Sequence, residues 1–260
     1  MARQSKRREP QPAPPPLPPE TRTVGQLVAE TIRLYGGRFW ASLALGIAPA
    51  AAGLGLAEAP DRARLPLAFT VAAAAASLSF ALATGVVAGE RVPGRRLAEA
   101  TAIGTITLAP AIVLLGFFGI VGLLPAVVWL AFAGTVVPVL TLERRISYRR
   151  AFALARADLG HAIGSLATLA LVGLLTAYVL FFTLRSAGTA ALRASAFLSV
   201  LVISPLLFLG GALLYFDQLA RVGSSPRRRR TDADVHPAVQ PDRSGGADAQ
   251  VEPRPAARGQ

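Results

Sequence analysis

Cysteine is absent from this chain of 260 residues, which excludes disulfides, thiolate catalysis and cysteine-ligated metal centres. Histidine is scarce as well, because only His161 and His236 occur. A histidine metal site or a Ser-His-Asp triad therefore has no convincing members, and no P-loop, nucleophile elbow or HExxH motif is present. The sequence predicts a protein that is not an enzyme and binds no cofactor or metal, with an intramembrane enzyme as the less favoured alternative.

Charged residues are also few, at 16% of the chain, whereas 53% of the residues are hydrophobic. The apolar residues form long runs, and a helix of about 20 such residues crosses the hydrocarbon core of a bilayer. One run, at 100–142, is long enough for two crossings and is divided by a cluster of glycines and Pro125. We therefore predict an all-α polytopic membrane protein, a bundle of six transmembrane helices at about 40–57, 65–89, 100–118, 124–142, 162–184 and 194–216.

Ionisable residues are missing from the middle of these predicted spans. The acids Glu58, Glu90, Glu99, Glu143 and Asp217 all lie at or beyond span ends, whereas a proton- or ion-coupled transporter is expected to hold one near mid-depth. The central polar residues are serines and threonines, which more often bond to their own helix or join helices. A small transporter or permease component remains the alternative function. It predicts a hydrated central cavity, whereas a scaffold predicts close packing of alanine and glycine.

Basic residues are distributed unequally over the two sides of the predicted bundle. Of the 27 lysines and arginines, 23 lie in the N-terminal region, the second and fourth loops and the C-terminal region. The positive-inside rule then places both termini in the cytoplasm, with the bundle in the inner or plasma membrane. The arginine tract at 227–230 favours attraction to anionic lipid over nucleic acid, because no interleaved aromatic side chains are available for base stacking.

Both ends of the chain lack apolar periodicity. Residues 1–22 are rich in proline and residues 222–260 in Pro, Asp and Arg, so we predict two disordered cytoplasmic tails around a membrane domain at 23–221. A ligand for an SH3-type domain is the alternative reading of the first tail.

An amphipathic helix is predicted at 23–37, immediately before the first span. Thr23 and Gln26 fit a capping box, and apolar residues recur at helical spacing. Such a helix lies in the headgroup plane rather than across the membrane, so we expect an interfacial helix, with an ordinary connector as the alternative.

The fourth loop concentrates the residues for which an interaction is most readily predicted. Pro138 bends the end of the fourth span, Glu143 ends it, and a second basic amphipathic segment begins at Ser147. Ion pairs between Glu143 and the neighbouring arginines are one reading. The other is a surface that binds anionic lipid headgroups or a protein partner. Its candidate residues are Arg144, Arg145, Arg149, Arg150 and Arg156.

Small residues mark candidate packing faces between helices. Two GxxxG patterns are present, Gly85 with Gly89 and Gly160 with Gly164, and packing within the bundle is favoured over dimerisation.

The chain also contains a weak internal similarity at a constant offset of 123 residues. Both copies begin on the same side of the membrane, so a duplication would be parallel rather than inverted. The matched positions are Arg33, Gly37, Ser42 and Leu43 with Arg156, Gly160, Ser165 and Leu166.

Four stretches together resemble a known family. These are LYGGRFW, VPVLTLE at a helix end, DLGHAIG, and LLYFDQLAR at the end of the last span. The pattern, from Thr23 to Arg221, is similar to the membrane domain attached to some bacterial glycerophosphoryl diester phosphodiesterases, which also occurs alone as a six-helix actinobacterial membrane protein. The resemblance implies that Pro138, Glu143, Tyr215 and Asp217 are family-signature positions of structural weight. The phosphodiesterase barrel and its metal-binding motifs are missing, which argues against hydrolysis.

The sequence thus predicts a non-enzymatic multi-pass membrane protein, a scaffold or a protein that contacts lipid or a partner at the cytoplasmic interface. The expected partners are anionic headgroups of membrane lipids, possible protein partners are unidentified, and no nucleic acid is expected.

Overall fold

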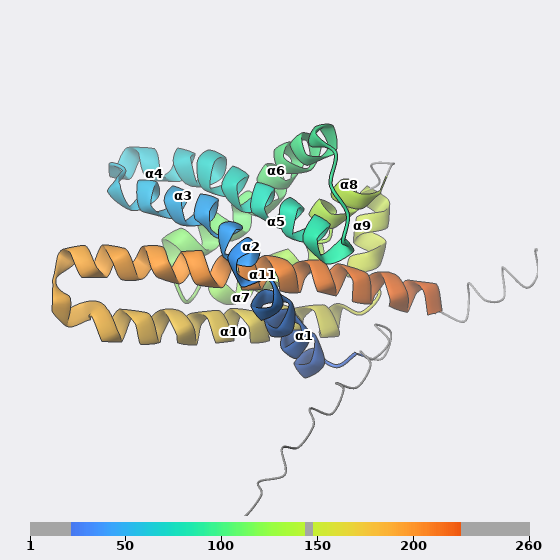
Figure 1. The fold of residues 1–260 in the computed structure, drawn as a ribbon. Coiled ribbons are helices and arrows are strands. Elements are labelled where there is room, and N and C mark those ends of the chain that lie inside the picture. Colours follow the sequence, from blue (N-terminus) through green and yellow to red (C-terminus); the bar gives the residue numbers. More distant parts are fainter. Residues whose placement is uncertain (1–21, 144–147, 225–260) are drawn as a thin grey trace, which may run out of the picture. The chain divides into compact units, whose positions relative to one another are not determined.

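The computed structural model describes residues 22–143 and 148–224, and every regular element in these ranges is a helix (Figure 1). The two predicted disordered tails, except Arg22 and residues 222–224, lie outside the described residues, as do Arg144 and Arg145. The elements are α1 (Val24–Gly37), α2 (Phe39–Ala44), α3 (Ile47–Glu58), α4 (Asp61–Leu67), η2 (Ala68–Ala72), α5 (Ala73–Ala88), α6 (Gly94–Phe118), α7 (Leu123–Ala133), α8 (Val136–Leu142), α9 (Tyr148–Ala155), α10 (Leu159–Leu184), η3 (Arg185–Ala187) and α11 (Thr189–Ser224).

Six helical stretches are long and apolar enough to cross a membrane, which confirms the six-helix fold predicted from the apolar runs. Their mean hydropathies run from 1.6 to 2.4, so the chain is a multi-pass membrane protein. The stretches are Phe39–Glu58, Asp61–Ala88, Gly94–Phe118, Leu123–Leu142, Leu159–Leu184 and Ala190–Gly223.

Two helices extend well beyond their predicted ends, in both cases through charged sequence. α6 begins at Gly94 rather than near residue 100, because Pro93 starts the helix and Arg95 and Glu99 pair one turn apart at 2.9 Å. α11 continues to Ser224 instead of ending near 216, and its added turns carry the fully buried Asp217. Hydropathy locates the membrane core, whereas the helices end where their backbone and side chains lose partners.

Three of the spans contain a break or a distortion. The first is divided between α2 and α3 at Gly46, where an added Cβ would overlap the Leu201 carbonyl of α11. The fourth is divided between α7 and α8 at Gly134 and Thr135. The second contains Pro66 followed by the π-helical turn η2, a widening that is frequent where a helix must absorb an irregularity. These breaks let the helices bend around one another.

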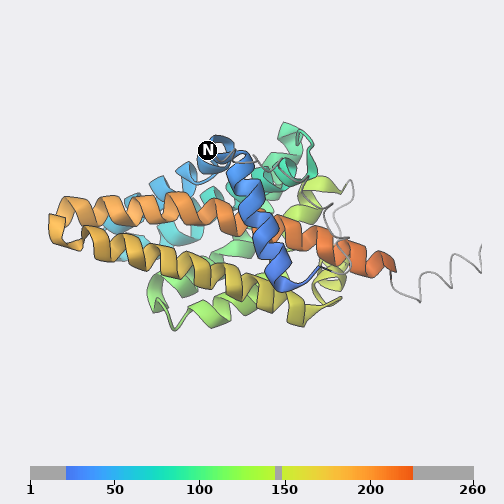
Figure 2. The same cartoon turned by 60° about the horizontal axis from the view of Figure 1, so that its bottom comes forward.

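α11 packs closely against several other helices. Its Ile203 side chain lies 2.7 Å from the position a Cβ would take at Gly173 of α10. On another face, a Cβ at Gly211 would lie 3.0 Å from the Phe80 ring of α5. Small residues therefore bring α11 close to both neighbours, as in other membrane helix pairs. α10 and α11 run side by side as an antiparallel pair in both views (Figures 1 and 2).

α1 lies across α10 and α11 (Figure 2). Its predicted capping box is confirmed, because the Gln26 amide donates to Thr23 Oγ1 and the Thr23 amide donates to Gln26 Oε1 at 2.8 Å. Leu27 and Val28 are buried in a cluster with residues of α10 and α11. The amphipathic helix is thus fastened to the bundle by its apolar face.

The structure gives both copies of the internal similarity the same order of elements. α1 precedes the first span and α9 precedes the fifth, so in each copy a short amphipathic helix leads into a span. Ser42 and Ser165 are both almost fully buried in those spans.

The close contact at Gly104 of α6 gives a prediction. An added Cβ there would overlap Ser77 Oγ and lie 2.9 Å from Val137 Cγ2, and Ser77 also donates to the Ala100 carbonyl. We expect Gly104→Ala to lower stability by about 1–3 kcal/mol through overpacking. Gly116→Ala in the same helix meets no atom within 4 Å and should be neutral or stabilising. Thermal unfolding in detergent measures both, and equal midpoints would contradict the packing.

Candidate functional site

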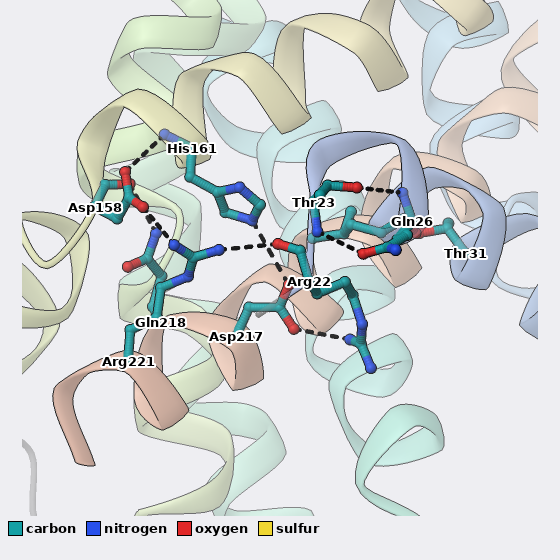
Figure 3. A network of polar contacts seen from close by, with 10 residues as sticks. Arg22, Thr23, Gln26, Thr31, Asp158, His161, Asp217, Gln218 and Arg221 are labelled. Carbon is teal, nitrogen blue, oxygen red and sulfur yellow. Dashed lines mark hydrogen bonds and ion pairs between the residues drawn. The ribbon is translucent and has the colours of Figure 1, made fainter. Parts of the chain in front are cut away.

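Buried charged and polar side chains gather at one end of the bundle. This end contains the start of α1, the end of α8, α9, the start of α10 and the end of α11. It is the end at which the sequence places most of the arginines. We call the group shown in Figure 3 the ionic cluster; its charged and amide members are Arg22, Asp158, His161, Asp217, Gln218 and Arg221.

Asp217 is the most buried member of the ionic cluster, with no exposed surface. Its Oδ1 accepts a hydrogen bond from Arg22 Nη1 at 2.8 Å, and the Arg22 side chain is only 10% exposed. Its Oδ2 lies 3.6 Å from His161 Nε2, which is beyond hydrogen-bonding distance (Figure 3). Arg22 was assigned by sequence to the disordered tail, yet it neutralises the buried carboxylate.

Asp158 and Arg221 form the second half of the ionic cluster. Asp158 caps α10, because its Oδ1 accepts from the His161 amide at 2.9 Å. Its Oδ2 pairs with Arg221 Nη1, and its backbone carbonyl accepts from Gln218 Nε2 at 3.0 Å. Arg221 Nη2 also donates to the Arg22 carbonyl at 3.0 Å (Figure 3). One end of α11 therefore holds the starts of both α1 and α10.

A smaller group joins α8, α9 and α11. Glu143 Oε1 accepts from Arg150 Nε at 2.6 Å and from the Tyr215 hydroxyl at 3.2 Å. The hydrogen bond with Glu143 raises the pKa of the Arg150 guanidinium above its usual value, so this group stays charged. Arg150 thus belongs to an ion pair within the protein, which is the simpler of the two predicted readings for this residue.

The face of α9 opposite its buried side is basic and aromatic. Ala151, Leu154 and Ala155 pack inward, whereas Arg149 and Arg156 are exposed. Tyr148 and Phe152 on the same outer side are 48% and 43% exposed. We call Tyr148, Arg149 and Phe152, together with Arg156 directly after the last residue of the helix, the outer face of α9. Of the five arginines proposed for headgroup contact, these two lie free of the ion pairs found among the described residues.

The four positions implied by the family resemblance are all in the packed interior or beside it. Pro138 is buried in α8, while Glu143 and Tyr215 bond to each other and Asp217 holds Arg22. Tyr215 and Asp217 therefore link α11 to the residue after α8 and to the segment before α1.

The two GxxxG patterns differ in what their glycines contact. Around Gly85 the nearest atoms belong to Glu90 and Val92 in the turn after α5, and Gly89 ends that helix in the left-handed region at φ 70°. This pair therefore forms a helix end rather than a contact between helices. Gly164 does face another helix, because an added Cβ would lie 3.5 Å from Val24 of α1, whereas Gly160 faces only Asp158.

Sequence reasoning missed most of the ionic cluster. Arg22 and Asp217 are 195 positions apart, and no periodicity links them. One usable signal was Asp158 before a helical run, which is a typical N-cap. Another was the sequence DQLAR, which places Asp217 and Arg221 one turn apart on α11.

The contacts of the ionic cluster join the segments that begin α1 and α10 to the end of α11. In residues 22–143 and 148–224, no three His, Cys, Asp or Glu side chains come together to hold a metal ion. Comparison of the chain with protein-family models, curated proteins and solved structures found no match. The function of this chain is therefore inferred from the geometry of its described residues.

The buried pair gives a second prediction. Arg22→Ala leaves Asp217 as a buried carboxylate without its main partner, so we expect a loss of about 3–5 kcal/mol in stability and release of α1 from the bundle. Arg33→Ala removes an exposed pair with Glu30 and should cost less than about 1 kcal/mol. Thermal unfolding and limited proteolysis at α1 measure both effects. A similar loss for both variants would contradict the assigned role of Asp217.

Proposed function

We propose that this chain is a non-enzymatic membrane scaffold whose cytoplasmic end contacts anionic lipid headgroups. The observation that carries the proposal is the outer face of α9, where Arg149 and Arg156, which form no ion pair found among the described residues, lie beside two half-exposed aromatic side chains. Arginine and aromatic side chains together favour the boundary between water and hydrocarbon. Each arginine near an anionic surface adds about 1 kcal/mol of attraction.

The start of the first span repeats this chemistry on the same side. Arg38 is exposed between α1 and α2, and Phe39 and Trp40 follow it with exposures of 42% and 79%. Exposed arginine and aromatic residues thus occur together both at α9 and at the junction of α1 with α2. This arrangement supports contact with the headgroup layer at two places.

The packing of the bundle favours a scaffold over the alternative of a small transporter. The hydroxyls of Thr105, Thr107, Thr168 and Thr176 donate to carbonyls of their own helices rather than lining a channel. Two hollows in the described part of the chain, of about 510 and 480 Å³, are apolar and open to the surface. Buried alanines are numerous in the core, as expected for a closely packed bundle.

The resemblance to the membrane domain of glycerophosphoryl diester phosphodiesterases remains a prediction. In that reading the chain corresponds to the membrane domain of such proteins, lies in the inner or plasma membrane, and carries out no hydrolysis itself.

A single tryptophan on α9 tests the headgroup contact. Trp40→Phe and Trp129→Phe remove the native tryptophans, and Phe152→Trp places a reporter on the outer face of α9. In nanodiscs containing brominated phosphatidylglycerol, Arg149→Gln with Arg156→Gln should reduce quenching, because each arginine enriches anionic lipid roughly fivefold. The matched control, Arg62→Gln with Arg185→Gln, alters the opposite end and should leave quenching unchanged. Unaltered quenching in the α9 variant would overturn the proposal.

The orientation of the bundle has its own test, because the chain has no cysteine to mask an introduced one. Both termini are proposed to face the cytoplasm, so Arg156→Cys should react with an impermeant maleimide only after the cells are opened. Arg62→Cys should react in intact cells. The reverse pattern of labelling would rule out the proposed orientation.

A further inference from the structure

A groove of about 510 Å³ runs between α5 and α6 and is open to the surface of the bundle. Small side chains form much of it, so its walls are low and apolar. The lining residues are Ala74, Leu78, Gly94, Leu97, Ala98, Thr101, Ala102 and Thr105.

The groove begins at the headgroup level and continues into the apolar part of the span. Along α6 it extends from Gly94 to Thr105, and a rise of 1.5 Å per residue makes this about 17 Å. The charged residues Arg95, Arg96 and Glu99 lie along its first half, and the apolar run begins near residue 100. A lipid of the cytoplasmic leaflet has this direction when its phosphate lies near Gly94 and one acyl chain extends past Thr105 toward the middle of the membrane.

The headgroup end of the groove is positively charged overall. Arg91, Arg95 and Arg96 lie within about one turn of Gly94, against the acids Glu90 and Glu99. Arg95 Nε lies 2.9 Å from Glu99 Oε1, so these two residues form an ion pair. The other charged residues at this end are Arg91, Arg96 and the exposed Glu90. The net charge of these five residues is +1, which complements a lipid with one phosphodiester charge.

The start of α6 adds donors at the same end. Its N-cap is Pro93, which provides no side-chain hydrogen bond, and its first turn contains no acid. The first amides of a long helix therefore face the headgroup layer without a capping side chain, and such amides favour a phosphate.

We propose that the groove between α5 and α6 is a binding site for one anionic glycerophospholipid. One acyl chain lies between Gly94 and Thr105, and the phosphate is bound by Arg91, Arg96 and the first amides of α6. This site goes beyond the proposed headgroup contact, because α9 takes no part in it. A single lipid is bound there through both its acyl chain and its phosphate.

Native mass spectrometry in mild detergent tests the proposal on the full chain. Phosphatidylglycerol and phosphatidylcholine with the same acyl chains are the two probes. The wild-type protein should retain one phosphatidylglycerol at concentrations where phosphatidylcholine is lost. Equal retention of the two lipids would overturn the proposal.

Two pairs of variants test the contact with the acyl chain and the contact with the phosphate separately. Ala98→Leu with Ala102→Leu fills the groove at exposed positions and should abolish the retained lipid, whereas the control Ala51→Leu with Ala196→Leu, also exposed, should keep it. Arg91→Gln with Arg96→Gln should weaken binding about thirtyfold, roughly fivefold for each arginine. Full retention in either groove variant would overturn the site.

A third variant separates this site from the proposed function. Arg149→Gln with Arg156→Gln should lower the quenching at α9 and leave the phosphatidylglycerol in the groove. If this variant instead releases the lipid, the binding site lies at α9 and the groove proposal fails while the headgroup contact stands.

Discussion

The absence of water from a bilayer core is the constraint on which this structure depends, because every backbone and side-chain polar group there must find its partner within the protein. Many side chains of the described spans meet it by local means, although a few buried hydroxyls, such as those of Ser42 and Ser165, have no hydrogen-bond partner. Threonines donate to their own helices, Ser77 joins α5 to α6, and Trp129 donates to the Thr107 carbonyl at 2.8 Å. Charges are kept to the ends, where Asp217 is buried only in company with Arg22.

α11 joins several of the helices to one another through apolar and ionic contacts. Its middle packs through glycine against α5 and α10, so van der Waals contact holds the spans where no hydrophobic force acts between helices and lipid. Its end carries Tyr215, Asp217 and Arg221, which reach α8, α1 and α10 in turn. A single helix therefore supplies apolar contacts at depth and ionic contacts at the surface, and it sets the position of both amphipathic helices.

The six spans were predictable because their apolar runs are an intrinsic property of the sequence, and the capping box at Thr23 was predictable because its partners are neighbours. The features that could not be predicted depend on contacts between residues that are far apart in the sequence. The break at Gly46 against Leu201 and the extension of α11 past residue 216 both reflect tertiary contacts. The pairing of Arg22 with Asp217 is the clearest case, since nothing near either residue indicates the other.

The bond from Arg221 to the Arg22 carbonyl also fixes where the two ends of the membrane domain meet. The segments before residue 22 and after residue 224 are attached to the bundle at nearly one point. A molecule that binds both segments would engage the second at high effective concentration once it holds the first. Two individually weak contacts would then give a complex that dissociates more slowly than either contact alone.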